Sequence, residues 1–202
     1  MIKDLQAHYR DLLRQHGDSP QAAQYSSRET QERRFEKLVD VADLNGCSIL
    51  DFGCGTGQLQ DYLLRHDVNV RYHGVDIVDE FLTLCQEKFP QGRFGQLQDF
   101  QGQQFDYVLV AGVFNNLMED NTAFYQSSLK TLFSMASKGL SFNMMSAYVD
   151  YQDEGLFYEY PEKVFAFLKR EVTPFVALHN DYEVKAGLPP FDFTVYAYRS
   201  GQ

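Results

Sequence analysis

The segment spanning residues 49–59 constrains the fold more than any other, because an apolar strand pattern runs directly into a glycine-rich turn and then into a helix pattern. Residues 47–52 form a short apolar run, typical of a parallel strand that is covered on both faces. Alternating glycines allow positive φ angles and let a ligand approach the backbone closely. They are Gly53, Gly55 and Gly57. The segment therefore predicts a strand, a nucleotide-binding turn and a helix.

The spacing of the glycines indicates which kind of nucleotide fits the turn. A dinucleotide turn of the form G-x-G-x-x-G requires a third glycine at position 58, where this chain has Gln58. Asp51 lies two residues before the first glycine, and its carboxylate would repel a pyrophosphate. The pattern therefore favours a ligand that carries positive charge over NAD, and it disfavours the alternative of an NAD-dependent dehydrogenase.

Asp51 and the glycine turn together resemble the first motif of the class I methyltransferases that use S-adenosylmethionine. This ligand carries a sulfonium and an ammonium group and has no phosphate. The resemblance implies that Asp51 supports the methionine part of the cofactor. It also implies that the turn contacts the cofactor through Gly53, Cys54, Gly55 and Gly57.

Two further strand ends match positions that this family uses to hold the nucleoside. Asp76 ends the strand pattern 70–76, where the family places an acid that accepts hydrogen bonds from both ribose hydroxyls, and Ile77 follows it. Asp99 and Phe100 match the position whose acid side chain and following backbone N–H contact the adenine edge. We therefore expect all four residues to bind the cofactor.

The segment 105–115 resembles the fourth-strand motif, which lies beside the transferred methyl group in this family. The resemblance implies that Ala111 and Gly112 contact the cofactor. Family members often fold an amino-terminal segment over the cofactor, and Tyr25 is the residue of that segment that we expect to bind it. The similarity extends over about 25–199, and it is closest to a bacterial subgroup whose substrate is unassigned.

The resemblance implies a methyltransferase that uses S-adenosylmethionine, forms S-adenosylhomocysteine and acts on a small molecule. Whether nitrogen, oxygen or sulfur is methylated stays open. An amine or a carboxylate is slightly favoured, because the sequence offers no strong general base. The alternative function is that of a regulatory or scaffold protein that binds S-adenosylmethionine without methyl transfer.

Helix and strand patterns alternate from residue 28 onward and predict an α/β fold. Specifically, we expect a Rossmann-like three-layer sandwich with a seven-stranded, mostly parallel sheet, an antiparallel last strand and additional amino-terminal helices. The chain 1–202 is predicted to be one domain, with residues 1–27 as a helix and cap segment. The pattern also predicts a polar loop at 18–26, a helix at about 28–44 and a strand at 93–97.

Catalytic residues are not fixed by the sequence, which offers three weak candidates. His179 lies at a predicted strand end, Asn115 ends the segment that resembles the fourth-strand motif, and Tyr148 belongs to a segment rich in aromatic and acidic residues, 147–160. This segment is predicted to be a lid over an amine or another polar substrate, the alternative being a solvated loop. A structural role for His179 is the alternative to catalysis.

Charge and composition exclude several classes of partner. The net charge of −10 argues against nucleic acid, because phosphate binding requires clustered basic residues. Arg28, Arg33, Arg34 and Lys37 are interleaved with glutamates, which predicts a solvated helix face. The apolar runs are shorter than a membrane span, so we expect a cytoplasmic protein. The cysteine spacing predicts reduced thiols and no metal site; the oligomeric state is left open between monomer and homodimer.

Overall fold

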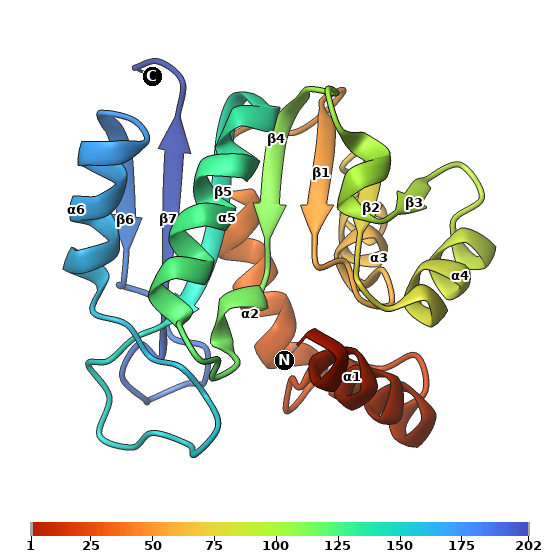
Figure 1. The fold of residues 1–202 in the computed structure, drawn as a ribbon, viewed down its shortest axis with the longest axis horizontal. Coiled ribbons are helices and arrows are strands. Elements are labelled where there is room, and N and C mark those ends of the chain that lie inside the picture. Colours follow the sequence, from red (N-terminus) through yellow and green to blue (C-terminus); the bar gives the residue numbers. More distant parts are fainter. Residues whose placement is uncertain (1, 202) are drawn as a thin grey trace.

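A seven-stranded β-sheet forms the centre of the part of the chain that the structure describes, residues 2–201 (Figure 1). The structure is a computed structural model that describes side chains from residue 5 to residue 201. Residues 1 and 202, which the predicted domain includes, lie outside the described residues. The strands are β1 (Ser48–Phe52), β2 (Arg71–Val75), β3 (Arg93–Gly95), β4 (Phe105–Val110), β5 (Ala136–Met145), β6 (Phe175–His179) and β7 (Asp192–Tyr198).

The strand order is β3-β2-β1-β4-β5-β7-β6, and the pairs from β3 to β5 are parallel. The last strand, β7, lies between β5 and β6 and runs antiparallel to both. A loop without a helix joins β6 to β7, which is the connection expected between antiparallel neighbours. The predicted Rossmann-like sheet with an antiparallel last strand is thereby confirmed.

Helices cover both faces of the sheet and complete the three layers (Figure 1). Along β1, Ile49 packs into a core cluster with α2 and α3, whereas Leu50 packs into a second cluster with α5 and α6. This alternation follows from the two-residue period of a strand. The helices are α1 (Ile2–His16), α2 (Arg28–Val39), α3 (Gln58–Arg65), α4 (Asp79–Lys88), α5 (Asn121–Met135) and α6 (Pro161–Glu171), with short 3₁₀ helices η1 (Pro20–Ala23), η2 (Leu97–Phe100) and η3 (Val113–Asn115).

The helix predicted over 28–44 ends at Val39, five residues early. Its last carbonyl groups find partners on the sheet instead of in another helical turn. The hydroxyl of Tyr196 donates to the Lys37 carbonyl (2.5 Å), and the hydroxyl of Ser141 donates to the Leu38 carbonyl (2.8 Å). Side chains from β5 and β7 thus satisfy the helix end, and a further turn would lose these bonds.

Two other boundaries differ from the predictions. The strand predicted over 93–97 ends at Gly95, because a capping box between Gln96 and Asp99 turns the chain into η2. The segment 18–26, predicted to be a loop, contains η1 with Pro20 at its first position, where the missing N–H is tolerated.

The amino-terminal cover, residues 2–26, lies beyond the sheet end toward which β1 and β4 point (Figure 1). The loop between β5 and α6 lies at the same end. Polar contacts fasten the cover to the loop after β2 and to α4: Nε2 of Gln6 donates to the Ile77 carbonyl (2.7 Å), and Arg10 pairs with Glu80 (2.5 Å). Ligands of parallel sheets bind at this end, so the cover faces the expected site.

Among residues 2–201, no helix combines the length and the apolar character needed to cross a membrane.

Candidate functional site

Neighbouring side chains crowd two of the three glycines in the turn between β1 and α3, whereas the third glycine borders open space. Gly53 has a φ of 82°, and a Cβ there would lie 2.3 Å from Cγ2 of Val113. Gly57 caps α3 with a φ of 77°, and its Cβ would lie 2.7 Å from the Phe89 ring. Gly55 has a φ of 52° and nothing within 4 Å of its Cβ position. Gly55 therefore borders open space, whereas neighbouring side chains restrict positions 53 and 57 to glycine.

A cavity of about 300 Å³, the first cavity, lies beside this turn at the carboxyl ends of β1, β2 and β4. Leu5 and Tyr9 of the amino-terminal cover form part of its wall. Gly57, one of the predicted cofactor residues, does not line it. The predicted cofactor residues that the cavity brings together are Asp51, Gly53, Cys54, Gly55, Asp76, Ile77, Ala111, Gly112 and Tyr25.

Asp51 is buried at the end of β1, with 2% of its surface exposed. The Tyr72 hydroxyl donates to its Oδ2, whereas its Oδ1 has no hydrogen-bond partner among the described residues. Burial raises the pKa of Asp51 to about 7, the Tyr72 bond opposes this rise, and the charge of nearby Asp76 adds to it. A buried carboxylate oxygen without a partner is unfavourable. The arrangement therefore suits a ligand that brings a positive charge to Asp51.

Asp76 immediately follows β2, on the other side of the turn. Its Oδ2 accepts a hydrogen bond from the Gly55 N–H (2.9 Å), and its Oδ1 accepts one from the Val78 N–H (3.0 Å). Burial raises the pKa of Asp76, and the backbone N–H groups of Val78, Gly55 and Ile77 oppose the rise. A carboxylate oxygen accepts more than one hydrogen bond. Asp76 is thus oriented by the backbone and keeps acceptor capacity for a diol.

Asp99 and Phe100, predicted to bind the cofactor, do not line the first cavity. Oδ2 of Asp99 accepts a hydrogen bond from the Gln96 N–H (2.8 Å), and Phe100 is fully buried in the core. Gln96, Leu97 and Gln98 line the first cavity in their place. The early end of β3 is the physical reason, because the turn that follows faces Asp99 back toward Gln96 and brings the preceding residues to the cavity.

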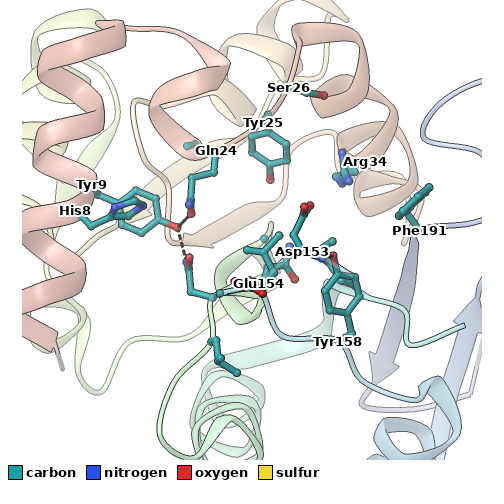
Figure 2. Close-up of a pocket in the computed structure, with 18 of the residues that line it drawn as sticks. His8, Tyr9, Gln24, Tyr25, Ser26, Arg34, Asp153, Glu154, Tyr158 and Phe191 are labelled. Carbon is teal, nitrogen blue, oxygen red and sulfur yellow. Dashed lines mark hydrogen bonds between the residues drawn. The ribbon is translucent and has the colours of Figure 1, made fainter. Parts of the chain in front are cut away.

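A larger cavity of about 910 Å³, the second cavity, lies next to the first (Figure 2). Figure 2 shows Tyr9 and Tyr25 of the amino-terminal cover on one side of it, and Asp153, Glu154 and Tyr158 on the other. The latter three belong to the loop after β5 that was predicted to be a lid. The volume lies in the range of small-molecule sites.

The two cavities share part of their walls, and the shared residues form the junction between them. Gly112 is central to the junction: its φ is 73°, and a Cβ there would lie 2.9 Å from the Tyr25 hydroxyl oxygen. That hydroxyl is buried and has no hydrogen-bond partner among the described residues. Burial raises the pKa of Tyr25, so the phenol stays protonated. The shared residues are Leu5, Tyr9, Ala23, Tyr25, Gly112, Asn116 and Met118.

Asn115 is the one of the three catalytic candidates that lies in the site. It lines the second cavity, and its Oδ1 is buried without a partner among the described residues. The next residue, Asn116, belongs to the junction and donates from Nδ2 to the Tyr9 hydroxyl (2.7 Å). Tyr9 in turn donates to Oε1 of Gln24 (3.0 Å). These bonds tie the junction to the amino-terminal cover.

Tyr148 and His179, the other two catalytic candidates, line neither cavity. Tyr148 is 59% exposed and donates to Oε1 of Glu162 (2.7 Å), which holds its ring toward α6. His179 ends β6, which β7 and β5 separate from the parallel strands of the site. Its Nδ1 lies 3.8 Å from Oδ1 of Asp181, and its ring packs against Tyr196.

Sequence reasoning missed a buried polar network that borders the second cavity. Arg34, predicted to lie on a solvated face, is partly buried and donates from Nε and Nη2 to the carboxylate of Asp192 (2.7 and 2.8 Å). Nδ2 of Asn143 donates to Oδ2 of the same carboxylate (2.8 Å), and Oδ1 of Asn143 accepts from the Gly112 N–H (2.8 Å). An acid at the start of an apolar strand was the signal that could have found it.

Comparison with known proteins agrees with this geometry. The family model for a methyltransferase domain matches residues 50–134, which include the glycine turn and Gly112. A protein of Mycobacterium tuberculosis (strain ATCC 25618 / H37Rv), named "Putative methyltransferase Rv1506c", is 31% identical over 170 residues. The match covers 79% of this chain and 96% of that protein.

Several solved methyltransferases share the fold. Magnesium protoporphyrin IX methyltransferase from Synechocystis PCC 6803, with bound S-adenosylmethionine, has a TM-score of 0.61 at 18% identity, covering 85% of this chain and 79% of that one. The plantazolicin methyltransferase BpumL, in complex with S-adenosylhomocysteine, has a TM-score of 0.63 at 15% identity, and the match covers 98% of this chain and 96% of that one. The CcbJ methyltransferase from Streptomyces caelestis has a TM-score of 0.66 at 13% identity, covering 96% and 98%.

Proposed function

This chain belongs to the class I S-adenosylmethionine-dependent methyltransferases, and we propose that it methylates a small-molecule acceptor held in the second cavity. One observation carries the proposal: a first cavity lined by the cofactor motif and a second, larger cavity meet at Gly112 and Tyr25. A donor in one and an acceptor in the other would face each other across this junction. Such positioning is the main contribution that an enzyme makes to a displacement reaction.

The first cavity fits S-adenosylmethionine. The unpartnered Oδ1 of Asp51 offers a place for a cationic group, and the backbone-held carboxylate of Asp76 offers acceptors for the ribose hydroxyls. The open space at Gly55 lets a ligand approach the backbone. When bound, S-adenosylmethionine supplies a methyl group on a positively charged sulfur. The residues of the chain hold it, orient it and exclude water.

The junction favours an acceptor atom that attacks without losing a proton first. Its described side chains are apolar, amide or phenolic, and burial raises the pKa values of both Tyr9 and Tyr25, which keeps these phenols neutral near pH 7. A neutral amine or an ionised carboxylate needs no base at this point, whereas an alkyl hydroxyl does. We therefore propose an amine or a carboxylate as the acceptor group.

Calorimetric titration with S-adenosylhomocysteine tests the first half of the proposal. We expect micromolar affinity, about 8 kcal/mol, for the wild-type protein. Asp76→Ala should weaken it at least about 30-fold, because two hydroxyls lose a charged acceptor. Glu87→Ala, which removes an exposed carboxylate from the neighbouring α4, is the matched control and should leave the affinity unchanged. An unchanged affinity for Asp76→Ala would contradict the assignment.

Incubation with S-adenosylmethionine and a panel of amines and carboxylates tests the second half. Release of S-adenosylhomocysteine that depends on one class of acceptor is the expected result. Tight cofactor binding combined with no transfer to any member of the panel would favour a regulatory or scaffold protein instead.

Gln96 supplies a separate prediction for the wall of the first cavity. We expect Gln96→Ala to weaken S-adenosylhomocysteine binding about tenfold, because the substitution removes a polar wall side chain and its bond to Asp79 (3.0 Å). Gln101→Ala is the matched control, since Gln101 follows η2, is exposed and does not line the cavity. Equal affinities for the two variants, measured by calorimetry, would remove Gln96 from the site.

A further inference from the structure

Arg34 presents a fixed guanidinium group to the second cavity. It extends from α2, its side chain is 15% exposed, and it lies in the cavity wall. Nε and Nη2 donate to Asp192, which is fully buried, and Nη1 donates to the Thr30 carbonyl (3.0 Å). A guanidinium has five N–H donors in a rigid plane, so two remain after these three bonds. The bonds fix the plane of the group and leave donors for a ligand.

The Tyr25 hydroxyl adds a second free donor beside Arg34. The Arg34 Cζ atom lies 5.5 Å from the centroid of the Tyr25 ring. The hydroxyl has no hydrogen-bond partner among the described residues, and Figure 2 shows it pointing into the cavity. Because burial raises the pKa of Tyr25, the hydroxyl keeps its proton and donates it to an acceptor atom.

A hydrogen-bond network places the guanidinium of Arg34 close to the junction, to which Tyr25 itself belongs. Asp192 holds Arg34, Asn143 bonds to Asp192, and Gly112 bonds to Asn143, so three consecutive hydrogen-bonded contacts connect the guanidinium to the junction. Asn143 is 1% exposed, and Asp192 is fully buried. Buried polar networks of this kind are rigid when every member is satisfied. The guanidinium of Arg34 is therefore pre-organised.

The other charged residues that line the second cavity lie on exposed segments. Asp153 and Glu154 belong to the loop after β5, and Lys185 belongs to the loop before β7; all three are exposed. Solvent and salt screen exposed charges strongly, whereas buried ones are screened much less. Arg34, whose charge is balanced by Asp192, is thus the least exposed of the charged side chains that line the second cavity, and its remaining N–H groups are the donors that a ligand close to the junction would meet.

We propose that the acceptor group is a carboxylate that accepts hydrogen bonds from Arg34 and Tyr25, and that the product is a methyl ester. This inference rests on the proposed methyltransferase function and selects one of its two acceptor classes. One carboxylate oxygen forms the new bond to the methyl carbon while the carbon–sulfur bond breaks and its electron pair stays on sulfur. The carboxylate is already ionised, so the step transfers no proton.

Three small probes of similar size test the inference by binding, without turnover: benzoate, benzamide and benzylamine. They are titrated into the protein saturated with S-adenosylhomocysteine and followed by ligand-observed NMR. We expect benzoate to bind at least tenfold more tightly than benzamide, because two donors match a carboxylate. Incubation with S-adenosylmethionine should then yield methyl benzoate, recognised by its mass and by its hydrolysis in base.

Variants of the buried pair separate recognition from folding. Arg34→Gln alone leaves Asp192 buried without its cation, so it is combined with Asp192→Asn, which removes both charges. In the double variant the preference for benzoate over benzamide should fall to within twofold, while the affinity for S-adenosylhomocysteine stays within threefold of wild type. Arg34→Lys keeps the charge without the planar fork and should retain part of the preference.

The remaining outcomes would overturn either the proposed function or the carboxylate inference. Failure to bind S-adenosylhomocysteine would overturn the proposed function itself. Normal cofactor binding with no preference for benzoate over benzamide would overturn the carboxylate inference alone. A preference for benzylamine would overturn it in favour of an amine acceptor, and a benzoate preference that survives in the double variant would remove Arg34 from acceptor recognition.

Discussion

Asp51→Asn is expected to weaken S-adenosylmethionine binding about 100-fold and, above pH 7, to make the ligand-free protein more stable. The first effect follows from loss of the buried carboxylate whose Oδ1 has no partner within the described chain. A 100-fold change corresponds to roughly 2.7 kcal/mol, within the range of a hydrogen bond to a charged group. The asparagine amide still accepts the bond from Tyr72, so the turn should keep its shape.

The second effect follows from the sign of the pKa shift. Burial raises the pKa of Asp51 from 3.8 to about 7, so the folded state binds a proton that the unfolded state releases at lower pH. The contribution of this carboxyl group to stability is therefore complete below pH 4 and is lost as the pH rises through about 7. The shift corresponds to roughly 4 kcal/mol. Asparagine carries no charge, so the stability of the Asp51→Asn variant does not fall as the pH rises through about 7.

Thermal unfolding and calorimetry across pH 4 to 8 check both effects. The melting temperature of Asp51→Asn should exceed that of wild type at pH 8 and approach it at pH 4. Wild-type affinity for S-adenosylmethionine should increase between pH 6 and 7.5, whereas that of the variant should stay flat. Tyr72→Phe is the matched control: it keeps the carboxylate but removes the bond to it, so the rise in affinity should move to higher pH. A variant as pH-dependent as wild type would contradict the prediction.

Gly112→Ala should lower the free energy of unfolding by roughly 2 to 4 kcal/mol and weaken S-adenosylhomocysteine binding. Gly112 has a φ of 73°, and its Cβ would lie 2.9 Å from the Tyr25 hydroxyl oxygen. The left-handed backbone costs about 1 kcal/mol with a Cβ present, and crowding of a packed site adds roughly 1 to 3 kcal/mol. The displaced tyrosine would also disturb the junction between the two cavities.

Two further variants separate backbone strain from crowding. Gly102→Ala has nearly the same φ, 77°, but nothing within 4 Å of its Cβ position, so it measures strain alone, roughly 1 kcal/mol. Gly112→Ala combined with Tyr25→Phe removes the crowded hydroxyl and should recover the difference between the two alanine variants. Urea unfolding gives these energies, and a double-mutant cycle gives the coupling. Additive effects at positions 112 and 25 would show that they do not interact.

The fold and the cofactor side of the site were predictable because local sequence determines them. Asp51 and Asp76 each end an apolar strand, and parallel neighbouring strands bring such ends together. The glycine turn was located correctly, although its explanation was incomplete. The positive φ angles predicted for Gly53 and Gly57 are confirmed, but crowding by Val113 and Phe89, rather than ligand approach alone, also leaves no room for a Cβ there. A sequence pattern does not distinguish these two causes.

The acceptor side was predicted poorly, because distant segments build it. Arg34 was placed on a solvated face since its neighbours in sequence are charged, and its partner Asp192 lies 158 residues away. His179 was chosen because it ends a strand, but β6 lies at the sheet edge, far along the order from β4. The strand predicted over 93–97 ends at Gly95, and the capping box that follows holds Asp99 toward Gln96, a turn that the sequence pattern did not reveal.

The amino-terminal cover contributes Leu5, Tyr9 and Tyr25 to both cavities, and we expect this shared wall to link the two binding equilibria thermodynamically. The ligand that binds first bears the free-energy cost of ordering the cover. The second ligand then binds to a cover that is already ordered. Linkage is reciprocal: an acceptor that tightens cofactor binding by some factor is itself bound more tightly by that same factor. Inhibition by S-adenosylhomocysteine would therefore deepen as the acceptor concentration rises.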